Sequence, residues 1–443
     1  MKLKKFLALG IAGIMTLSLA ACGNSQSGQG SSGSDEANSG SGSGTSLTVS
    51  WWGNQARNEV TQKALDLYSE QNPGVTFDGQ FAEWADYWNK LATASAGHTL
   101  PDIIQMDYKY LEQYVSNGLL VDLTPYIEDG TIDVSSVSED ILNSGKVGDG
   151  LYAIPTGINA PALVYNKTVT DEAGVTIKDN MSMEEFYDVC RQVYEKTGYK
   201  TDVAYGNGDV FIEYMMRSEG AVLYETGKIG ATQEQLEKFF DVYEMGISEG
   251  WMCAPSIYAE RTLNSPEQFP LVYGSSPDTM SWCAFTYSNQ LGTLRGVAPE
   301  GTELAMTTWP ADDQMAADYL RPGMFFSVTV DSKNQDEAAK VLDFWTNSVE
   351  ANEILLGERG VPISSTVADA ISGKMDESNQ EIIRYINEVV TPTSSVINPP
   401  APEGSAQVSE LIDQLEEQVC YQQISAADAA EQLYTQGNAM MAN

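Results

Sequence analysis

PDIIQMDYKYLEQYVSNGLLVDLTPYIE, residues Pro101–Glu128, is the stretch from which the fold can be predicted. Ile103 and Ile104 are β-branched and follow a proline, so they indicate a short buried strand. A helix that ends near Gly118 follows this strand. Asp107 therefore lies where a strand meets a helix. Because ligands of open α/β sheets bind outside the carboxyl ends of the strands, we expect this carboxylate to hold a ligand.

The residues before this stretch repeat the alternation of strand and helix. Residues 47–51 alternate apolar and polar side chains, which predicts a strand, and residues 75–81 predict a second one. Farther along, Ser182 and Thr232 each begin a capping box that predicts a helix start. Residues 251–300 are expected to be irregular. The order β-α-β-α-β-α predicts an α/β fold with a mainly parallel sheet and helices on both faces.

Length and charge limit the classes of protein that fit this chain. Its 443 residues exceed one typical domain, so two or three are expected. The net charge of −38 argues against nucleic acid and anionic lipid surfaces as nonspecific partners, because the summed field repels them. We interpret the charge as a solvated acidic surface that favours neutral or cationic ligands.

The first residues have the pattern of a targeting segment. Lys2, Lys4 and Lys5 precede an apolar run at 6–21 that is too short for an ordinary membrane span. The run ends in LAAC, which resembles a bacterial lipobox in which Cys22 becomes the lipidated first residue. We expect residues 1–21 to be a lipoprotein signal peptide and residues 22–45 a flexible Gly/Ser tether. An ordinary secretory signal with a chance cysteine is the alternative.

Three segments carry a resemblance to a known family. The stretch 101–128, the pair GLYAIP and ALVYNK within 150–167, and RPGMFFSV at 321–328 resemble family 1 extracellular solute-binding proteins of carbohydrate ABC importers. That group includes lipoproteins of the maltose-binding-protein type. The resemblance implies a two-lobe, type II periplasmic-binding-protein-like fold with three interlobe crossovers and closure around a ligand. The implied N-terminal lobe is 46–155 plus 322–361, and the C-terminal lobe is 156–321 plus 362–443.

Aromatic and polar side chains at the expected strand ends and loops suit a sugar. Flat rings stack on the C–H faces of pyranoses, and carboxylates, amides and guanidinium groups pair with hydroxyls. The candidate ligand-binding residues are Trp52, Asn54, Arg57, Glu83, Trp84, Tyr87, Asp107, Tyr108, Asn159, Trp282, Tyr287, Arg321, Phe325 and Glu358.

Two of these candidates carry the sharpest hypothesis. We expect closure to bring Asp107 and Trp282 to one sugar, with the carboxylate accepting hydroxyl hydrogens and the indole covering a ring face. The alternatives are that Asp107 caps its own helix and that Trp282 belongs to the core. Arg57 and Arg321 fit structural salt bridges equally well.

Signatures of cofactor and metal chemistry are not found in the sequence. His98 is the only histidine, and the chain has no GxGxxG after a strand, no P-loop and no EF-hand loop. The cysteines downstream of Cys22 have no zinc-ligand spacing. A disulfide between Cys253 and Cys283 is left open, because spacing alone does not decide it. We expect no cofactor, no metal and no enzyme activity.

The predicted function is capture of an oligosaccharide or other glycoside outside the cell and its delivery to an ABC permease. The expected protein is a monomer, lipid-anchored at the cell membrane and facing the extracellular side, as in Gram-positive bacteria. An extracellular glycosidase or lyase is one alternative, since a retaining glycosidase needs only two carboxylates about 5–5.5 Å apart. A sugar-sensing surface lipoprotein without a transport role is the other.

Overall fold

The computed structural model describes residues 44–53, 55–259, 261, 265–402 and 404–442. The expected signal peptide, Cys22, residues 22–43 of the expected tether, and Asn54 lie outside the described residues. Within the described part of the chain, no helix is both long enough and apolar enough to cross a membrane.

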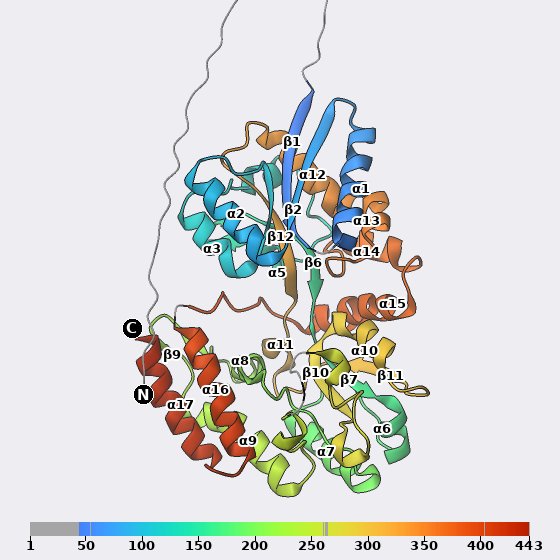
Figure 1. The fold of residues 1–443 in the computed structure, drawn as a ribbon, viewed down its shortest axis with the longest axis vertical. Coiled ribbons are helices and arrows are strands. Elements are labelled where there is room, and N and C mark those ends of the chain that lie inside the picture. The colour runs from blue at the N-terminus through green and yellow to red at the C-terminus, as the bar shows by residue number, and fades with distance from the viewer. Residues whose placement is uncertain (1–43, 54, 260, 262–264, 403, 443) are drawn as a thin grey trace, which may run out of the picture. The chain divides into compact units, whose positions relative to one another are not determined.

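A five-stranded sheet forms the core of the first lobe (Figure 1). Its strands, in spatial order, are β2 (Val75–Ala82), β1 (Thr45–Trp52), β3 (Ile103–Met106), β12 (Arg321–Val328) and β6 (Ile154–Asn159). β1 pairs in parallel with β2 and β3, as the sequence predicted, whereas β12 runs antiparallel to β3 and β6. The alternating pattern of β1 buries Leu47, Val49 and Trp51, so this strand fixes one face of the sheet.

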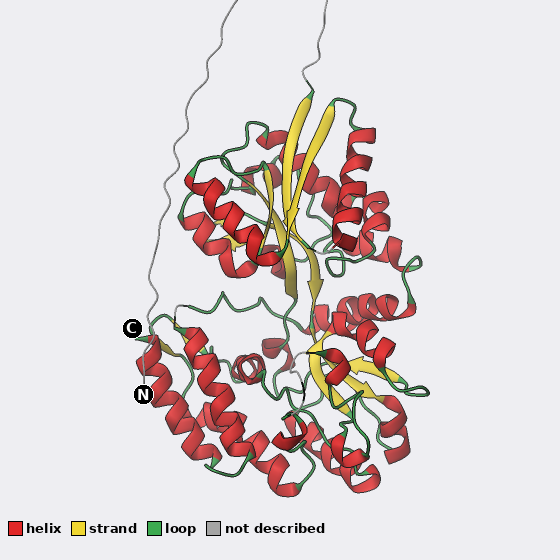
Figure 2. Ribbon diagram, in the orientation of Figure 1, coloured by secondary structure: helices red, strands yellow, loops and turns green. Residues whose placement is uncertain are grey.

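Helices flank this sheet on both faces, which is also what the alternating order predicted (Figure 2). They are α1 (Gln55–Gln71), α2 (Trp84–Ala96), α3 (Tyr108–Ser116), α4 (Thr124–Glu128), α5 (Glu139–Asn143), α12 (Gln335–Asn347), α13 (Val349–Leu355) and α14 (Ser365–Ser372). A small hairpin of β4 (Lys146–Val147) and β5 (Gly150–Leu151) lies between α5 and β6 in the chain.

A three-stranded antiparallel sheet organises the second lobe. Its order is β10 (Cys283–Tyr287), β7 (Pro161–Asn166), β11 (Leu304–Thr307). A hairpin of β8 (Tyr224–Glu225) and β9 (Lys228–Ile229) lies apart from it. The helices are α6 (Lys167–Ala173), α7 (Met183–Thr197), α8 (Gly208–Ser218), α9 (Gln233–Glu249), α10 (Leu291–Val297), α11 (Gln314–Ala317), α15 (Glu377–Arg384), α16 (Ser405–Cys420) and α17 (Ala426–Met441).

Short helical turns complete the element list. They are η1 (Pro255–Ile257), η2 (Pro266–Gln268), η3 (Pro277–Thr279), η4 (Ser288–Gln290), η5 (Tyr385–Val390) and η6 (Thr391–Thr393). The capping boxes expected at Ser182 and Thr232 are present and begin α7 and α9. The expectation that residues 251–300 are irregular is wrong in part, because this stretch contains β10 and α10.

Several segments of the chain connect the sheet of the first lobe with that of the second. β6 leads into β7 through Ala160, and the chain returns to the first sheet by way of β12. Val361 forms a β-bridge with Ile158 of β6. The main chain at Arg359 crosses so close to Gly157 that an added Cβ there would lie 2.3 Å from the Arg359 carbonyl oxygen, so only glycine fits.

The lobe boundaries given above stay a proposal. Contacts in the structure favour a different position for the third passage of the chain between the lobes. α14 packs against α13, and Ser364 forms a β-bridge with Val137 of the first lobe. These contacts favour a third passage after α14 rather than one that begins at 361.

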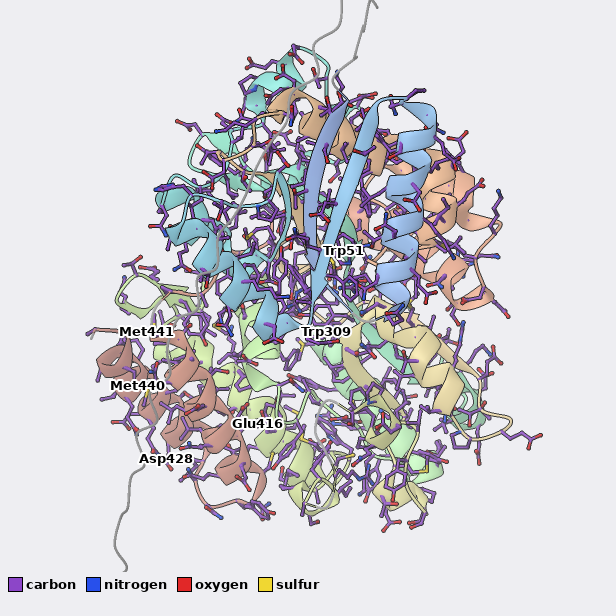
Figure 3. All side chains as sticks on the ribbon, turned by 45° about the horizontal axis from the view of Figure 1, so that its top comes forward. Trp51, Trp309, Glu416, Asp428, Met440 and Met441 are labelled. Atoms are coloured by element: carbon purple, nitrogen blue, oxygen red, sulfur yellow. The ribbon has the colours of Figure 1, made fainter. Side chains whose placement is uncertain are left out.

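Large aromatic side chains fill the cores of both lobes. Figure 3 labels Trp51 at the first sheet and Trp309 in the second lobe, and both side chains are buried. Trp309 packs edge-to-face on Phe211 and Tyr214 of α8. This packing holds α8 against the stretch that follows β11, and α8 contributes to the site described below.

The buried carboxyl group of Asp318 makes the second lobe sensitive to pH. Its Oδ1 accepts a hydrogen bond from Tyr214 and its Oδ2 accepts one from Gln314, both at 2.8 Å. Burial raises the pKa of Asp318 to about 7, although these two bonds and Arg217 oppose the rise. Between about pH 4 and pH 7 the folded state therefore holds a proton that the unfolded state, with a pKa of about 3.9, has released.

We expect the stability of the wild type to fall as pH rises from 5 to 8, because Asp318 ionises in a buried site. Asp318→Asn replaces the titrating carboxyl group with a neutral amide. It should therefore reduce the loss of unfolding free energy between those pH values by an amount on the order of 2 kcal/mol. Urea unfolding of both proteins at pH 5 and pH 8 measures the difference. Identical pH slopes would contradict a neutral Asp318 in the folded state.

Candidate functional site

The carboxyl ends of the parallel strands bring several candidate residues to one edge of the first sheet. Trp52 ends β1, Glu83 follows β2, and Asp107 follows β3. Because β12 is antiparallel, its first residue, Arg321, lies at the same edge and pairs with Asn159 at the end of β6. We call these five residues the strand-end edge. It is the place where ligands bind in open α/β sheets.

The second lobe meets this edge through Tyr287. Tyr287 ends β10 and pairs with Pro161, which follows β6 by way of Ala160. The Arg321 guanidinium lies 4.8 Å from the centre of the Tyr287 ring, a cation–π distance. The Tyr287 hydroxyl lies 3.1 Å from that of Tyr319. Interactions with Tyr287 first, and also with Tyr319 and Asp107, raise the pKa of Arg321.

Trp84 offers an accessible aromatic face beside the strand-end edge. Its side chain is 42% exposed, whereas that of Trp52 is only 8% exposed. The two indoles meet edge-to-face with their centres 4.9 Å apart. Trp52 in turn packs on Tyr87 and Trp88, so it supports Trp84 from behind. Trp84 is therefore the indole placed to stack on a sugar ring.

Asp107 and Tyr108 begin α3 with different partners. Asp107 is the N-cap, and its Oδ1 accepts a hydrogen bond of 2.9 Å from the backbone N–H of Lys109. The capping alternative for Asp107 is thus observed. Tyr108 stacks on Phe325 and donates a hydrogen bond of 3.1 Å to the carbonyl oxygen of Asn398. Burial raises the pKa of Tyr108 to about 12, so its hydroxyl stays a donor at neutral pH.

Arg57 and Glu358 form an ion pair rather than an open binding surface. The Arg57 Nε lies 2.8 and 2.9 Å from the two carboxylate oxygens of Glu358, and Arg57 also donates to the Trp52 carbonyl. The structural salt bridge anticipated for Arg57 is therefore present. Both side chains border a cavity of about 380 Å³ that Asn159 and Asn379 also line.

Trp282 is a correction to the sequence-based site. Its side chain is completely buried, packs on Phe186 and donates a hydrogen bond of 2.8 Å to Thr201 Oγ1. Trp282 precedes β10, whereas Tyr287 ends it, so at about 3.3 Å per residue the two lie roughly 16 Å apart. The indole therefore lies in the core at the end of β10 that is remote from the strand-end edge.

Tyr87 and Phe325 are also core residues instead of ligand contacts. Tyr87 is 1% exposed and donates a hydrogen bond of 2.6 Å to the Gln105 carbonyl. Phe325 is fully buried in the centre of β12, where it supports Tyr108. Trp51 and Trp345 are buried as well.

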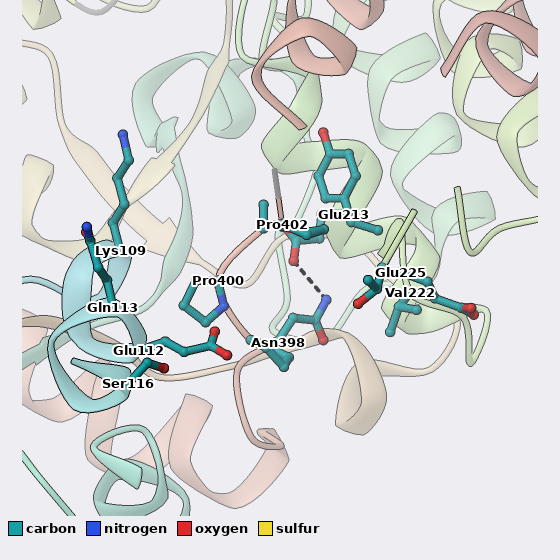
Figure 4. Close-up of a pocket in the computed structure, with 14 residues that line it drawn as sticks. Lys109, Glu112, Gln113, Ser116, Glu213, Val222, Glu225, Asn398, Pro400 and Pro402 are labelled. Atoms are coloured by element: carbon teal, nitrogen blue, oxygen red, sulfur yellow. Dashed lines mark hydrogen bonds between the residues drawn. The ribbon is translucent and has the colours of Figure 1, made fainter. Parts of the chain in front are cut away.

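A second, larger cavity was not predicted from the sequence. We call residues 394–402 the strap and the space beside it the strap cavity, which has a volume of about 900 Å³ (Figure 4). Asn398 of the strap donates a hydrogen bond of 2.8 Å to Glu213 of α8 and accepts one of 2.7 Å from Arg217. The prolines of the strap were the only signal for an extended segment, and they do not indicate what it contacts.

The described residues show no metal centre. They include no group of three or more histidine, cysteine and acidic side chains arranged to hold a metal ion. Cys190, Cys253, Cys283 and Cys420 are free, buried thiols, so the structure does not form the disulfide left open between Cys253 and Cys283.

Comparison with known proteins identifies similar chains. The family described as "Bacterial extracellular solute-binding protein" matches residues 52–250. A lactose-binding protein of Rhizobium radiobacter is 26% identical over 196 residues, which are 42% of this chain and 45% of the relative.

Solved structures are similar over most of the chain. A family 1 extracellular solute-binding protein from Alicyclobacillus acidocaldarius has a TM-score of 0.81 at 24% identity, covering 90% of this chain and 99% of the other. An oligogalacturonide-binding protein from Yersinia enterocolitica has a TM-score of 0.74 at 21% identity, with the same coverage of 90% and 99%. These likenesses show the fold, which is the two-lobe, type II periplasmic-binding-protein-like α/β fold predicted from the sequence.

Proposed function

Because the chain belongs to the bacterial extracellular solute-binding proteins, we propose that it captures an oligosaccharide or other glycoside at the strand-end edge and delivers it to an ABC permease. The observation that supports this proposal most is the convergence of an accessible indole, two carboxylates, an amide and a guanidinium on one edge between the lobes. This set combines an apolar face with polar groups of both signs, which a sugar requires.

Each group at the strand-end edge has a distinct role in this proposal. Trp84 covers a C–H face of one sugar ring. Asp107 and Glu83 accept hydroxyl hydrogens, whereas Arg321 and Asn159 donate to hydroxyl oxygens. Tyr287 keeps the Arg321 guanidinium in place across the lobes. The ligand lies between the lobes, whose relative rotation about the connecting strands closes the site.

Two relatives and the chemistry of the strand-end edge support this choice of ligand class. The relative from Rhizobium radiobacter is a lactose-binding protein, and another from Halalkalibacterium halodurans is an arabinooligosaccharide-binding protein. Both ligands are neutral sugars, and a neutral ligand suits a chain with a net charge of −38.

A ligand panel tests the proposal directly. Thermal unfolding is measured with neutral mono-, di- and oligosaccharides, and each sugar that raises Tm is titrated by calorimetry. We expect at least one oligosaccharide to bind, to stay intact during incubation, and to lower the radius of gyration in solution scattering. A panel without any binder sinks the proposed function, and release of shorter products would favour a glycosidase or lyase.

We also propose that a lipid on Cys22 anchors the protein outside the cytoplasmic membrane. The lipobox-like LAAC and the Gly/Ser tract after it support this proposal. Cys22→Ala should move the protein from the membrane fraction to the soluble fraction. Equal membrane retention of the variant and the wild type would contradict the anchor.

A further inference from the structure

The strap cavity begins two residues after the strand-end edge along the chain. Asp107 belongs to the edge, and Lys109 of the next helix already lines the cavity. A chain-like ligand held at Asp107 can therefore extend along α3 into this space. Its volume of about 900 Å³ lies near the top of the range of about 300–1,000 Å³ that is typical of small-molecule sites.

Two lobes provide the walls of the strap cavity (Figure 4). Lys109, Glu112, Gln113 and Ser116 are spaced so that they share one face of α3, and this face lines the cavity. Glu213 of α8 and the β8 hairpin line it from the second lobe. The prolines of the strap add apolar ring surfaces. Polar groups and apolar rings are thus combined here as they are at the strand-end edge.

The charge of the lining is mainly negative. Among the described residues that line the cavity, Glu112, Glu213 and Glu225 carry carboxylates and Lys109 is the single cation. Glu225 is already paired with Lys228 at 2.7 Å. Burial raises the pKa of Glu213, although Asn398 and Arg217 oppose the rise. Carboxylates accept hydrogen bonds from hydroxyl or ammonium groups, and they repel a ligand carboxylate.

We propose that the strap cavity is a subsite that continues the strand-end edge, accepts the uncharged or amino-bearing end of an extended oligosaccharide, and rejects uronic acid units. The inference rests on the proposed function and specifies its ligand. It also distinguishes this chain from the structurally similar oligogalacturonide-binding protein, whose ligand is anionic.

The first test blocks the cavity. Ser116 is an exposed residue at the end of α3 that lines the cavity, and Ser248 is an exposed residue near the end of α9 that does not. Ser116→Trp and Ser248→Trp therefore form a matched pair. Malto-, cello-, xylo- and galacto-oligosaccharides, from disaccharides to hexasaccharides, are titrated into both variants and the wild type.

We expect wild-type affinity to rise with chain length in the series that binds. Ser116→Trp should weaken binding of the longest member by roughly tenfold, about the loss of one good hydrogen bond to a charged group, and leave the disaccharide unchanged. Ser248→Trp should match the wild type. If Ser116→Trp binds the long chain as tightly as the wild type, the subsite is overturned while the proposed function stands.

The second test changes charge. Glu112→Lys reverses a charge on the cavity wall, and Glu128→Lys makes the same change at an exposed position at the end of α4. Oligogalacturonides should bind the wild type at least roughly tenfold more weakly than neutral galacto-oligosaccharides of equal length. Glu112→Lys should narrow this gap and Glu128→Lys should not.

The outcomes separate the two proposals. Oligogalacturonides that bind as tightly as the neutral chains overturn the charge selection, although the protein still binds sugars. If no oligosaccharide of any series raises Tm or gives heat on titration, the proposed function fails, and the subsite fails with it.

Discussion

Trp282→Ala is expected to lower the free energy of unfolding by about 3–5 kcal/mol, because it empties a fully buried indole site. The variant also leaves Thr201 Oγ1 without the indole N–H that now donates to it at 2.8 Å. Ligand affinity, measured on the fraction that stays folded, should not change, because the indole lies remote from the strand-end edge. Urea unfolding and calorimetric titration of the same preparation give the two quantities.

Tyr287→Ala is the matched control for this prediction, since it lies at the other end of β10. Its ring is partly exposed and holds the Arg321 guanidinium at 4.8 Å. We expect a smaller loss of stability than for Trp282→Ala and a clear loss of sugar affinity. Suppose instead that Trp282→Ala weakened binding but had the same midpoint of urea unfolding as the wild type. The indole would then belong to the site, and its assignment to the core would be wrong.

The contrast between these two residues shows how far the sequence predicts the site. Parallel pairing of β1 with its neighbours follows from apolar alternation and from strands separated by helices, and both are local patterns. Asp107 and Asn159 lie at the strand-end edge for the same reason. A prediction of where β3 and β6 end also predicts where the residues at those ends lie. The positions of these two residues at the ends of their strands were therefore predictable, whereas their role in binding stays a proposal.

Trp282 was misplaced because β10 was not predicted. Residue types alone do not show which end of an extended segment lies near the other lobe. The pairing of a strand with its neighbours decides this. The antiparallel pairing of β10 (Cys283–Tyr287) with β7 places Tyr287 near the end of β6 and leaves Trp282 in the core. Without that strand, a large indole in an irregular segment was the natural choice for a ligand contact.

The strap cavity was beyond reach of the sequence for a different reason. Its walls come from α3, α8 and the strap, and the Tyr108–Asn398 hydrogen bond joins residues 290 positions apart. Pairings of this kind depend on the packing of both lobes and leave no periodic pattern. The signal that exists is compositional, because prolines at 399, 400 and 402 favour an extended segment.

Asp107→Ser separates the two roles that the structure gives to this residue. A serine hydroxyl still accepts a hydrogen bond from the helix start, so the cap of α3 is retained, but the carboxylate is lost. Hydrogen bonds to a charged group contribute roughly 1.5–3 kcal/mol, and a tenfold change in affinity is about 1.4 kcal/mol. We therefore expect sugar affinity to fall by roughly tenfold to a hundredfold while Tm changes little.

A second capping aspartate provides the control for this change. Asp313 caps α11, and its side chain accepts a hydrogen bond of 3.1 Å from the Ala316 N–H. Asp313→Ser makes the same chemical change away from the strand-end edge, so it should alter neither affinity nor Tm by much. Intact affinity in Asp107→Ser would mean that this carboxylate only caps its helix. Polar recognition of the sugar would then rest on Glu83, Asn159 and Arg321, because these are the remaining polar groups of the strand-end edge.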